Sequence, residues 1–331
     1  MKNALLAIIG VLLISTSVFA NKDAVLRFDR QSLNESQLEP WMQQSLYEIR
    51  REAWEKTRVL LEQRALDLYI VKQAESQGKD KNEVMAGLLA IKPVSDNDIQ
   101  AFYDNYRYRI QVPLDTVREA IREQLEGVRK KEKVTSVLVM IRKERDLQIL
   151  VPEPKRPVFN LPLAGYPVQG KQDAPFTLVE FADYRCSYCK KGGEMVSRLM
   201  EAFPDSLKVV YVDFPVVDPT SGISTTVIRG AWCAGRQDRY WNYHKLAYEQ
   251  QGRLSDRSPH VIATKMGLDI AAFNACMTSQ ESLAFVDQAI AFGRHYGVST
   301  TPTFFLNGQQ LSEADIESQI RERLSRQHKV R

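Results

Sequence analysis

Residues 176–191 read FTLVEFADYRCSYCKK. The first seven are dense in β-branched and aromatic residues and lie between Ala174-Pro175 and Asp183-Tyr184, a pattern that predicts a buried strand. The apolar residues that follow recur at helical spacing, at Met195, Val196, Leu199, Met200 and Phe203. Residues 208–214 form a second apolar run. The sequence therefore predicts a strand–helix–strand unit, with a Cys-x-x-Cys pair where the first strand meets the helix.

Cys186 and Cys189 lie where sulfur chemistry is favoured. Cys186 is expected at the first position of the helix, where unpaired backbone N–H groups and the macrodipole stabilise a thiolate. Arg185, Lys190 and Lys191 add positive charge nearby. The spacing lets the two sulfurs close a small ring, with Cys189 one turn inside the helix. We therefore predict that Cys186 exchanges with a substrate sulfur and that Cys189 resolves the mixed disulfide.

Two other roles for this pair are half of a zinc site and a purely structural disulfide. A zinc site needs a second pair of ligands, but Cys233 and Cys276 are isolated and no histidine lies at ligand spacing. A structural disulfide rarely has so tight a spacing at the start of a helix. Redox chemistry is therefore the prediction, with no metal and no cofactor expected.

The start of the chain predicts export. Residues 1–20 combine a short positive segment, an apolar run of about fifteen residues and Val18-Phe19-Ala20, which together indicate a cleaved signal peptide rather than a membrane anchor. We expect a periplasmic protein, in a compartment where disulfides persist. The net charge of +4 is small for 331 residues, and no RNP, zinc-finger or basic-zipper pattern is present, so no nucleic-acid partner is expected.

The length predicts two domains, and prolines mark the boundary. Residues 151–167 are rich in proline, which predicts an extended linker. Residues 21–150 are expected to be mainly helical. Their predicted elements are a strand over 24–28, helices over about 40–77, from about 96 and over about 115–142, and a strand over 146–151. This half contains neither cysteine nor histidine, so catalysis is not expected there.

Four features make residues 158–328 resemble a DsbA-family thioredoxin-like domain, with the domain itself placed at 168–328. The strand leads directly into the Cys-x-x-Cys pair, and Glu180 stands six residues before the first cysteine. A helical segment of about 224–296 interrupts the sheet. Residues 297–308 read GVSTTPTFFLNG and match the family's cis-proline loop. The resemblance implies an α/β thioredoxin-like fold with a helical insertion.

The resemblance and the residue chemistry together suggest roles for four residues beside the cysteines. Burial would raise the pKa of Glu180, so that it could relay a proton to or from Cys189; an ordinary edge-strand acid is the alternative. Pro302 is anomalous inside a β-like run, and a cis Thr301–Pro302 bond would let the Thr301 backbone pair with an extended substrate; a plain loop proline is the alternative. Tyr188, between the cysteines, is also expected to face the substrate.

Cys233 and Cys276 flank the middle of the predicted insertion. In an oxidising compartment, two remaining cysteines in one subdomain most simply form a stabilising disulfide. Similar pairs occur in some members of the family that the sequence resembles. Free buried thiols remain the alternative.

Residues 21–150 resemble the N-terminal chaperone domain of SurA-type periplasmic folding factors. The opening strand, the long helix, the segment VSDNDIQAFY at 94–103, and the long charged helix followed by a strand carry the likeness. It implies a domain that holds unfolded substrate. A helical spacer or an arm that forms a homodimer is an equal alternative.

The direction of the redox reaction depends on two departures from typical strong oxidases. Ser187-Tyr188 replaces their Pro-His, and Thr301 replaces their valine, so that both positions resemble the isomerase and reductase branch. We expect a disulfide isomerase or reductase that acts on unfolded or misoxidised secreted proteins and depends on a membrane redox partner of unknown identity. A DsbA-like oxidase, a holdase with secondary redox activity and a Cu(I) carrier are the alternatives.

Overall fold

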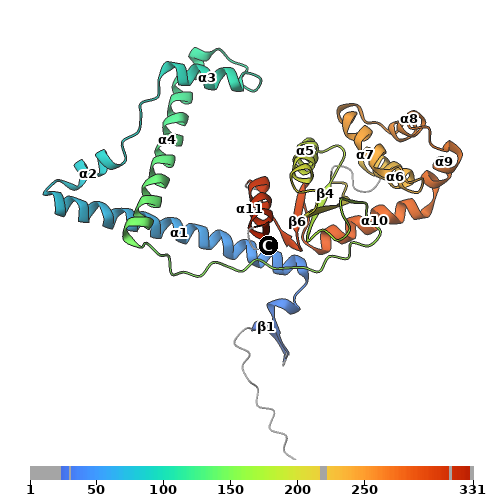
Figure 1. The fold of residues 1–331 in the computed structure, drawn as a ribbon, viewed down its shortest axis with the longest axis horizontal. Helices are drawn as coiled ribbons and strands as arrows, with labels where there is room; N and C mark the ends of the chain where they lie inside the picture. The colour runs from blue at the N-terminus through green and yellow to red at the C-terminus, as the bar shows by residue number, and fades with distance from the viewer. Residues whose placement is uncertain (1–23, 30, 217–221, 313–314, 329–331) are drawn as a thin grey trace, which may run out of the picture. The chain divides into compact units, whose positions relative to one another are not determined.

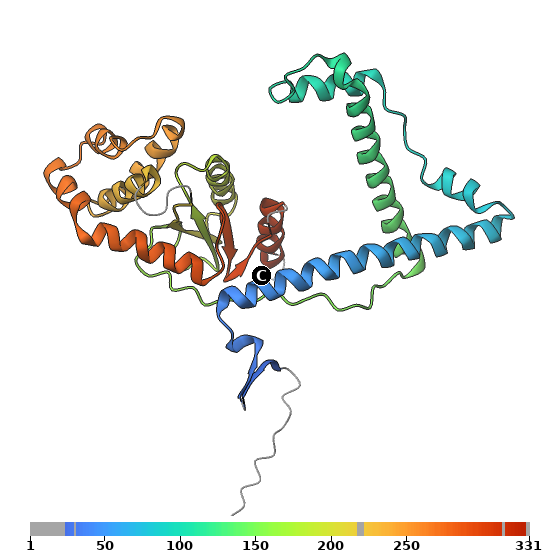
Figure 2. The ribbon, with the colours of Figure 1, turned by 180° about the vertical axis from the view of Figure 1, so that it is seen from behind.

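The structure is a computed structural model that describes residues 24–29, 31–216, 222–312 and 315–328 (Figure 1; seen from behind in Figure 2). The predicted signal peptide at 1–20 lies outside the described residues. The described residues form two compact units, one of residues within 24–47 and 156–328 and one of residues 48–155. We call them the sheet unit and the helical unit. No helix in the described part is both long and apolar enough to span a bilayer.

The division differs from the prediction that residues 21–150 form one domain. A hairpin of β1 (Ala24–Phe28) and β2 (Gln31–Asn34), followed by the short 3-10 helix η1 (Glu35–Gln37), belongs to the sheet unit. So do the first turns of α1 (Pro40–Gln77), where Tyr47 is buried and its ring faces Arg156. These contacts join segments more than a hundred residues apart in sequence, and no local pattern reports them.

The helical unit contains the rest of α1 with α2 (Lys81–Leu88), α3 (Asp96–Tyr106) and α4 (Leu114–Arg145). Ser95 opens α3 in a reciprocal capping box with Asp98, as its sequence pattern indicates. The buried apolar residues form two small clusters. Leu66, Ile70, Val137 and Ile141 join α1 to α4, and Val94, Ile99 and Ile121 join α3 to α4.

The strand predicted over 146–151 is wrong. Asp146 ends α4 in the left-handed conformation, with φ at 48°, and the residues after it have no strand partner in the described part of the chain. Leu150 is 86% exposed, so the apolar pattern of this segment is not used for burial. An alternating pattern forms a strand only where a neighbouring strand accepts its hydrogen bonds.

The sheet unit is built on a five-stranded sheet in the order β3-β5-β4-β6-β7. Its strands are β3 (Val168–Gln169), β4 (Phe176–Ala182), β5 (Leu207–Asp213), β6 (Thr303–Leu306) and β7 (Gln309–Gln310). β4 pairs in parallel with β5 and antiparallel with β6, so it is central and buried on both faces. This explains why residues 176–182 are apolar except at Thr177 and Glu180.

Alternate residues of β4 face different helices. Leu178 packs in a cluster with residues of α5 (Ser187–Ala202) and α11 (Ile316–His328). Val179 and Phe181 pack in another cluster, with residues of α10 (Gln280–His295). Glu180 is two residues from Leu178 and therefore lies on the α5 face, beneath the helix that carries Cys189.

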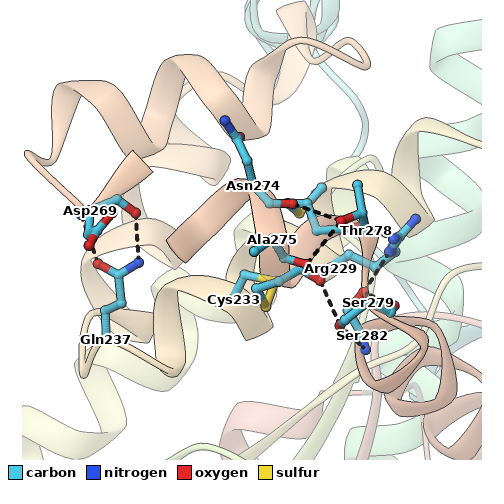
Figure 3. The surroundings of a disulfide bond; sticks show 11 residues. Arg229, Cys233, Gln237, Asp269, Asn274, Ala275, Thr278, Ser279 and Ser282 are labelled. Atoms are coloured by element: carbon cyan, nitrogen blue, oxygen red, sulfur yellow. Dashed lines mark hydrogen bonds between the residues drawn. A yellow bond between two sulfur atoms is a disulfide. The ribbon is translucent and has the colours of Figure 1, made fainter. Parts of the chain in front are cut away.

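The insertion between β5 and β6 consists of α6 (Ile223–Gly235), α7 (Tyr240–Glu249), the 3-10 helix η2 (Gln251–Arg253), α8 (Ser258–Lys265), α9 (Ile270–Thr278) and α10. Cys233 of α6 and Cys276 of α9 form a disulfide with a Cα–Cα distance of 5.7 Å (Figure 3). Both side chains of the predicted structural pair are therefore bonded in this structure, and not free thiols.

Candidate functional site

The Cys-x-x-Cys pair lies where β4 meets α5. α5 begins at Ser187, so Cys186 is its N-cap residue and not its first helical residue as predicted. The Cys189 N–H donates to the Cys186 carbonyl at 3.0 Å and closes the first turn. Both thiols are free; Cys186 is partly exposed and Cys189 is fully buried. Solvent therefore reaches Cys186 but not Cys189, as the predicted roles of attacking and resolving cysteine require.

The structure brings the proline loop to the cysteines. The Thr301–Pro302 peptide bond is cis, and the Cys186 Sγ donates to the Thr301 carbonyl at 3.3 Å. These residues are 115 positions apart in the sequence. Gly192 lets α5 lie close to Glu180 and to Pro302 of the proline loop. A Cβ at this position would lie 3.3 Å from the Glu180 Oε1 and 3.5 Å from the Pro302 Cγ.

The Cys189 thiol is held in its protonated form. Burial raises its pKa above the ordinary range of a thiol. Hydrogen bonds with the Asp183 backbone and the Thr301 side chain act in the opposite direction, and the nearby Cys186 raises the pKa further. A group that removes the proton is therefore needed before Cys189 can act as a nucleophile.

Glu180 is suited to that step. It is 2% exposed, its Oε1 makes no hydrogen bond in the described structure, and burial raises its pKa to about 8. With a pKa of about 8, Glu180 is mostly protonated at pH 7, and its minor carboxylate fraction can accept a proton.

A cavity of about 400 Å³ connects Glu180 with the surface. Lys190 and Gly193 of α5 form one wall, and Trp241, His244 and Tyr248 of α7 contribute to the other. A cavity of this size, lined by Lys190 and Glu180 together with apolar side chains, has room for water that can exchange protons with the carboxyl group.

The exposed side of the site carries Tyr188. Its side chain is 67% exposed, and the Lys191 ammonium lies 5.9 Å from the centre of its ring. The tyrosine thus faces solvent beside Cys186, where an incoming substrate would meet it. Its role in substrate binding stays a prediction.

Several polar residues under the site were missed by the sequence reasoning. Asp183 is fully buried, and its carboxylate accepts hydrogen bonds from the Arg185 N–H at 2.8 Å and the Val216 N–H at 3.0 Å. The Tyr184 hydroxyl and the His244 Nδ1 are 3.1 Å apart. Burial lowers the pKa of His244 to about 3, so the ring is neutral at ordinary pH. An acidic residue directly after a buried strand was the available signal for Asp183.

Asp213 lies at the end of β5 and pairs with Ala182 of β4. It is fully buried, it accepts a hydrogen bond from the Tyr240 hydroxyl at 2.8 Å, and burial raises its pKa to about 7. In the described parts of the chain, no group of three or more His, Cys, Asp or Glu side chains is arranged to hold a metal ion.

Comparison with known proteins agrees with this geometry. Residues 164–325 match a family model described as Thioredoxin. The C-terminal half of the chain is a thioredoxin-like domain. This confirms the predicted fold class and the resemblance of that half, while the SurA-type resemblance of the N-terminal half stays a prediction.

Individual matches also cover about half of the chain or less. A Na(+)/H(+) antiporter NhaA 1 of Salinispora arenicola is 28% identical over 143 residues, which are 43% of this chain. The matched part is 22% of that relative, so this chain spans about a fifth of its length. The thiol-disulfide exchange protein alpha-DsbA2 of Wolbachia pipientis is 21% identical, with a TM-score of 0.44, over 49% of this chain and 87% of that one. A thioredoxin-like oxidoreductase of Silicibacter pomeroyi is 27% identical, with a TM-score of 0.43, over 50% and 92%.

Proposed function

We propose that this protein is a thiol–disulfide oxidoreductase that acts on exported proteins through Cys186 and Cys189. The observation that carries the proposal is the pair itself. A partly exposed thiol lies at a helix N-terminus, 3.3 Å from the Thr301 carbonyl of a cis-proline loop, with a buried free thiol one turn further on. A helix N-terminus favours the thiolate, which is the reactive form.

Reduction of a substrate disulfide takes two exchanges. The Cys186 thiolate attacks one substrate sulfur, the substrate S–S bond breaks, and the other substrate sulfur leaves as a thiolate that takes a proton from water. Cys189 passes its proton to the Glu180 carboxylate and attacks the Cys186 Sγ, which releases the second substrate thiolate. The substrate gains two electrons, and the protein is left with a Cys186–Cys189 disulfide.

Isomerisation begins with the same attack by Cys186 but does not use Cys189. A substrate thiolate attacks the mixed disulfide, a different substrate disulfide forms, and the Cys186 thiolate is regenerated with no net transfer of electrons. Glu180 serves the reductive course, in which Cys189 must lose its proton, since a pKa of about 8 lets it take up and release a proton near neutral pH.

We favour isomerase or reductase activity over oxidase activity. A histidine beside the reactive cysteine would stabilise the thiolate and make the disulfide more oxidising, whereas Tyr188 supplies no positive charge. The equilibrium of the protein with glutathione tests the direction. A protein redox potential of about −200 mV supports an isomerase or reductase, and one of about −120 mV supports the alternative of an oxidase.

The proposed setting is the periplasm, reached through the signal peptide at residues 1–20, with unfolded or misoxidised secreted proteins as substrates. An isomerase or reductase must be kept reduced there, so a membrane redox partner that supplies electrons is part of the proposal. If that partner is lost, the Cys186–Cys189 disulfide should accumulate in cells beyond the level that the purified protein reaches in equilibrium with glutathione.

A second candidate function is holding unfolded chains, and a crevice in the helical unit favours it. The crevice has a volume of about 610 Å³ and lies between α1 and α4. Its lining combines the apolar side chains of Val59, Leu66, Val134, Leu138 and Val139 with the charged side chains of Arg58, Glu62, Lys130, Lys131 and Arg142. Suppressed aggregation by the Cys186→Ala, Cys189→Ala double variant would support it, and loss of suppression in that variant would contradict it.

A homodimer formed through the N-terminal region remains part of the proposal. Ile49 and Leu60 lie eleven positions apart on α1 and are 64% and 65% exposed, so they present an apolar stripe at helical spacing. Sedimentation of the full chain tests it: a dimer that becomes monomeric in Leu60→Glu supports this interface, and a monomeric wild type contradicts it.

A further inference from the structure

The loop between β4 and α5 is held by the helical insertion on two sides. On one side, the buried Asp183 carboxylate accepts hydrogen bonds from the Ser224 hydroxyl of α6 at 2.8 and 3.0 Å. On the other side, the Gln251 side chain of η2 reaches the loop. The backbone of residues 183–186 is therefore fixed by contacts with residues 41 to 67 positions further along the chain.

Gln251 contacts the loop through one nitrogen atom. Its Nε2 donates to the Tyr184 carbonyl at 2.8 Å and to the Cys186 carbonyl at 2.8 Å. An amide nitrogen has two hydrogens, and both are used here. Since Cys186 is the N-cap residue of α5 and its carbonyl also accepts from the Cys189 N–H, Gln251 holds the carbonyl on which the first turn of the helix is built.

We infer that Gln251 is a positioning residue for the Cys186 thiolate, an inference that rests on the proposed function. It orients the N-cap backbone so that the Cys186 Sγ stays at the N-terminus of α5 and next to the Thr301 carbonyl. The helix N–H groups stabilise a thiolate only in that orientation, because the favourable field falls off within the first turn. The insertion thus sets the reactivity of a cysteine that it does not contain.

Substitution of Gln251 changes the thiolate in a definite direction. Gln251→Met has a similar length but no donor, so the loop loses two hydrogen bonds. A less well-held thiolate raises the pKa of Cys186 and stabilises the protein disulfide relative to the dithiol. We expect the equilibrium constant with glutathione to move toward the protein disulfide by about five- to tenfold.

Two further variants separate hydrogen bonding from shape. Gln251→Glu places a carboxylate against two carbonyl oxygens and should exceed the effect of Gln251→Met. Gln251→Lys restores N–H donors to both carbonyls and should keep the thiol pKa at or below that of the wild type. Gln250→Glu is the matched control for charge, since the Gln250 side chain makes no hydrogen bond within the described residues.

The experiment is a pH titration of thiolate absorbance at 240 nm, with the glutathione equilibrium and the thermal unfolding temperature measured on the same full-length samples. A raised thiol pKa in Gln251→Met and Gln251→Glu, but not in Gln251→Lys or Gln250→Glu, supports the inference. An unchanged pKa in Gln251→Met, whether or not the unfolding temperature falls, overturns it and leaves only a structural role. A wild type without exchange activity would instead refute the proposed function.

Discussion

The two pairs of cysteines in the sheet unit differ in every property that governs reactivity. Cys186 and Cys189 are three residues apart at the start of a helix, are both free, and include one thiol that solvent reaches. Cys233 and Cys276 are 43 residues apart and are bonded across two helices, with Cys233 fully buried. Under the proposed function, access and the local field, and not the presence of a thiol, separate the exchanging pair from the structural one.

The surroundings of the bonded pair explain its structural role. Cys233 packs in the aromatic core of the insertion with Tyr243 and Phe273. Nearby, Gln237 and Asp269 exchange two hydrogen bonds of 3.1 and 2.9 Å, which tie the end of α6 to the start of α9 (Figure 3). The disulfide therefore closes a segment that hydrogen bonds and packing already hold together.

The largest expected effect is the loss of exchange activity in Cys186→Ser. The hydroxyl group does not form the thiolate that attacks a disulfide, so activity should fall to the background of the uncatalysed reaction. The Cys233→Ala, Cys276→Ala double variant is the control and should keep its activity, measured as reduction of a small aromatic disulfide. Activity in Cys186→Ser would place the reactive thiol elsewhere and remove the contrast between the pairs.

Cys189→Ser should trap the reaction at its midpoint. Cys186 can still capture a substrate sulfur, but no thiol is present to resolve the mixed disulfide. We expect a covalent adduct on Cys186 with a small disulfide, visible by intact-mass spectrometry and released by dithiothreitol. If the adduct decays as fast as in the wild type, Cys189 is not the resolving residue.

Removal of the Cys233–Cys276 bond should affect stability. For a loop closed over 43 residues, the chain-entropy model gives about 4 kcal/mol of unfolding free energy. Denaturant unfolding of the Cys233→Ala, Cys276→Ala double variant measures it, with Cys186→Ala, Cys189→Ala as the matched control that removes two thiols but no bond. A larger loss in the control would reverse the assignment of the two pairs.

Glu180 should impose a pH dependence on stability. Burial raises its pKa from 4.5 to about 8, so the folded protein keeps a proton that the unfolded chain has lost. This contribution is fully present below pH 4.5 and is lost as the pH rises toward 8, by at most about 1.4 kcal/mol per pH unit. Glu180→Gln should flatten the slope in unfolding experiments between pH 5 and 8. An unchanged slope would show that another group causes it.

Thr301→Val is expected to have the smallest effect. It removes a side-chain hydrogen bond that lowers the pKa of Cys189, so the resolving step should slow by about three- to tenfold. The decay rate of the mixed disulfide in stopped-flow mixing measures this step. Thr300→Val alters the neighbouring, exposed threonine and should not change the rate. Equal slowing in both variants would indicate a general disturbance of the loop.

Local signals in the sequence determined several parts of this fold. The apolar run of 176–182 is β4, the Ser95 capping box starts α3, and Asn307-Gly308 joins β6 to β7. The position of the cysteine pair between a strand and a helix is of the same kind. Each of these features depends on residues within a few positions of one another, and spacing and side-chain type are sufficient to report it.

Only the tertiary structure decided which distant groups meet at the site. The Thr301 carbonyl lies beside Cys186, and Gln251 bonds to the loop that carries Cys186; both contacts join segments more than 60 residues apart. The Glu180 Oε1, which has no hydrogen-bond partner among the described residues, owes its burial to distant segments that line its cavity. The absence of a strand at 146–151 has the same origin. A residue's pattern predicts what it can do locally, whereas its pKa and its partners depend on the atoms that the completed fold places around it.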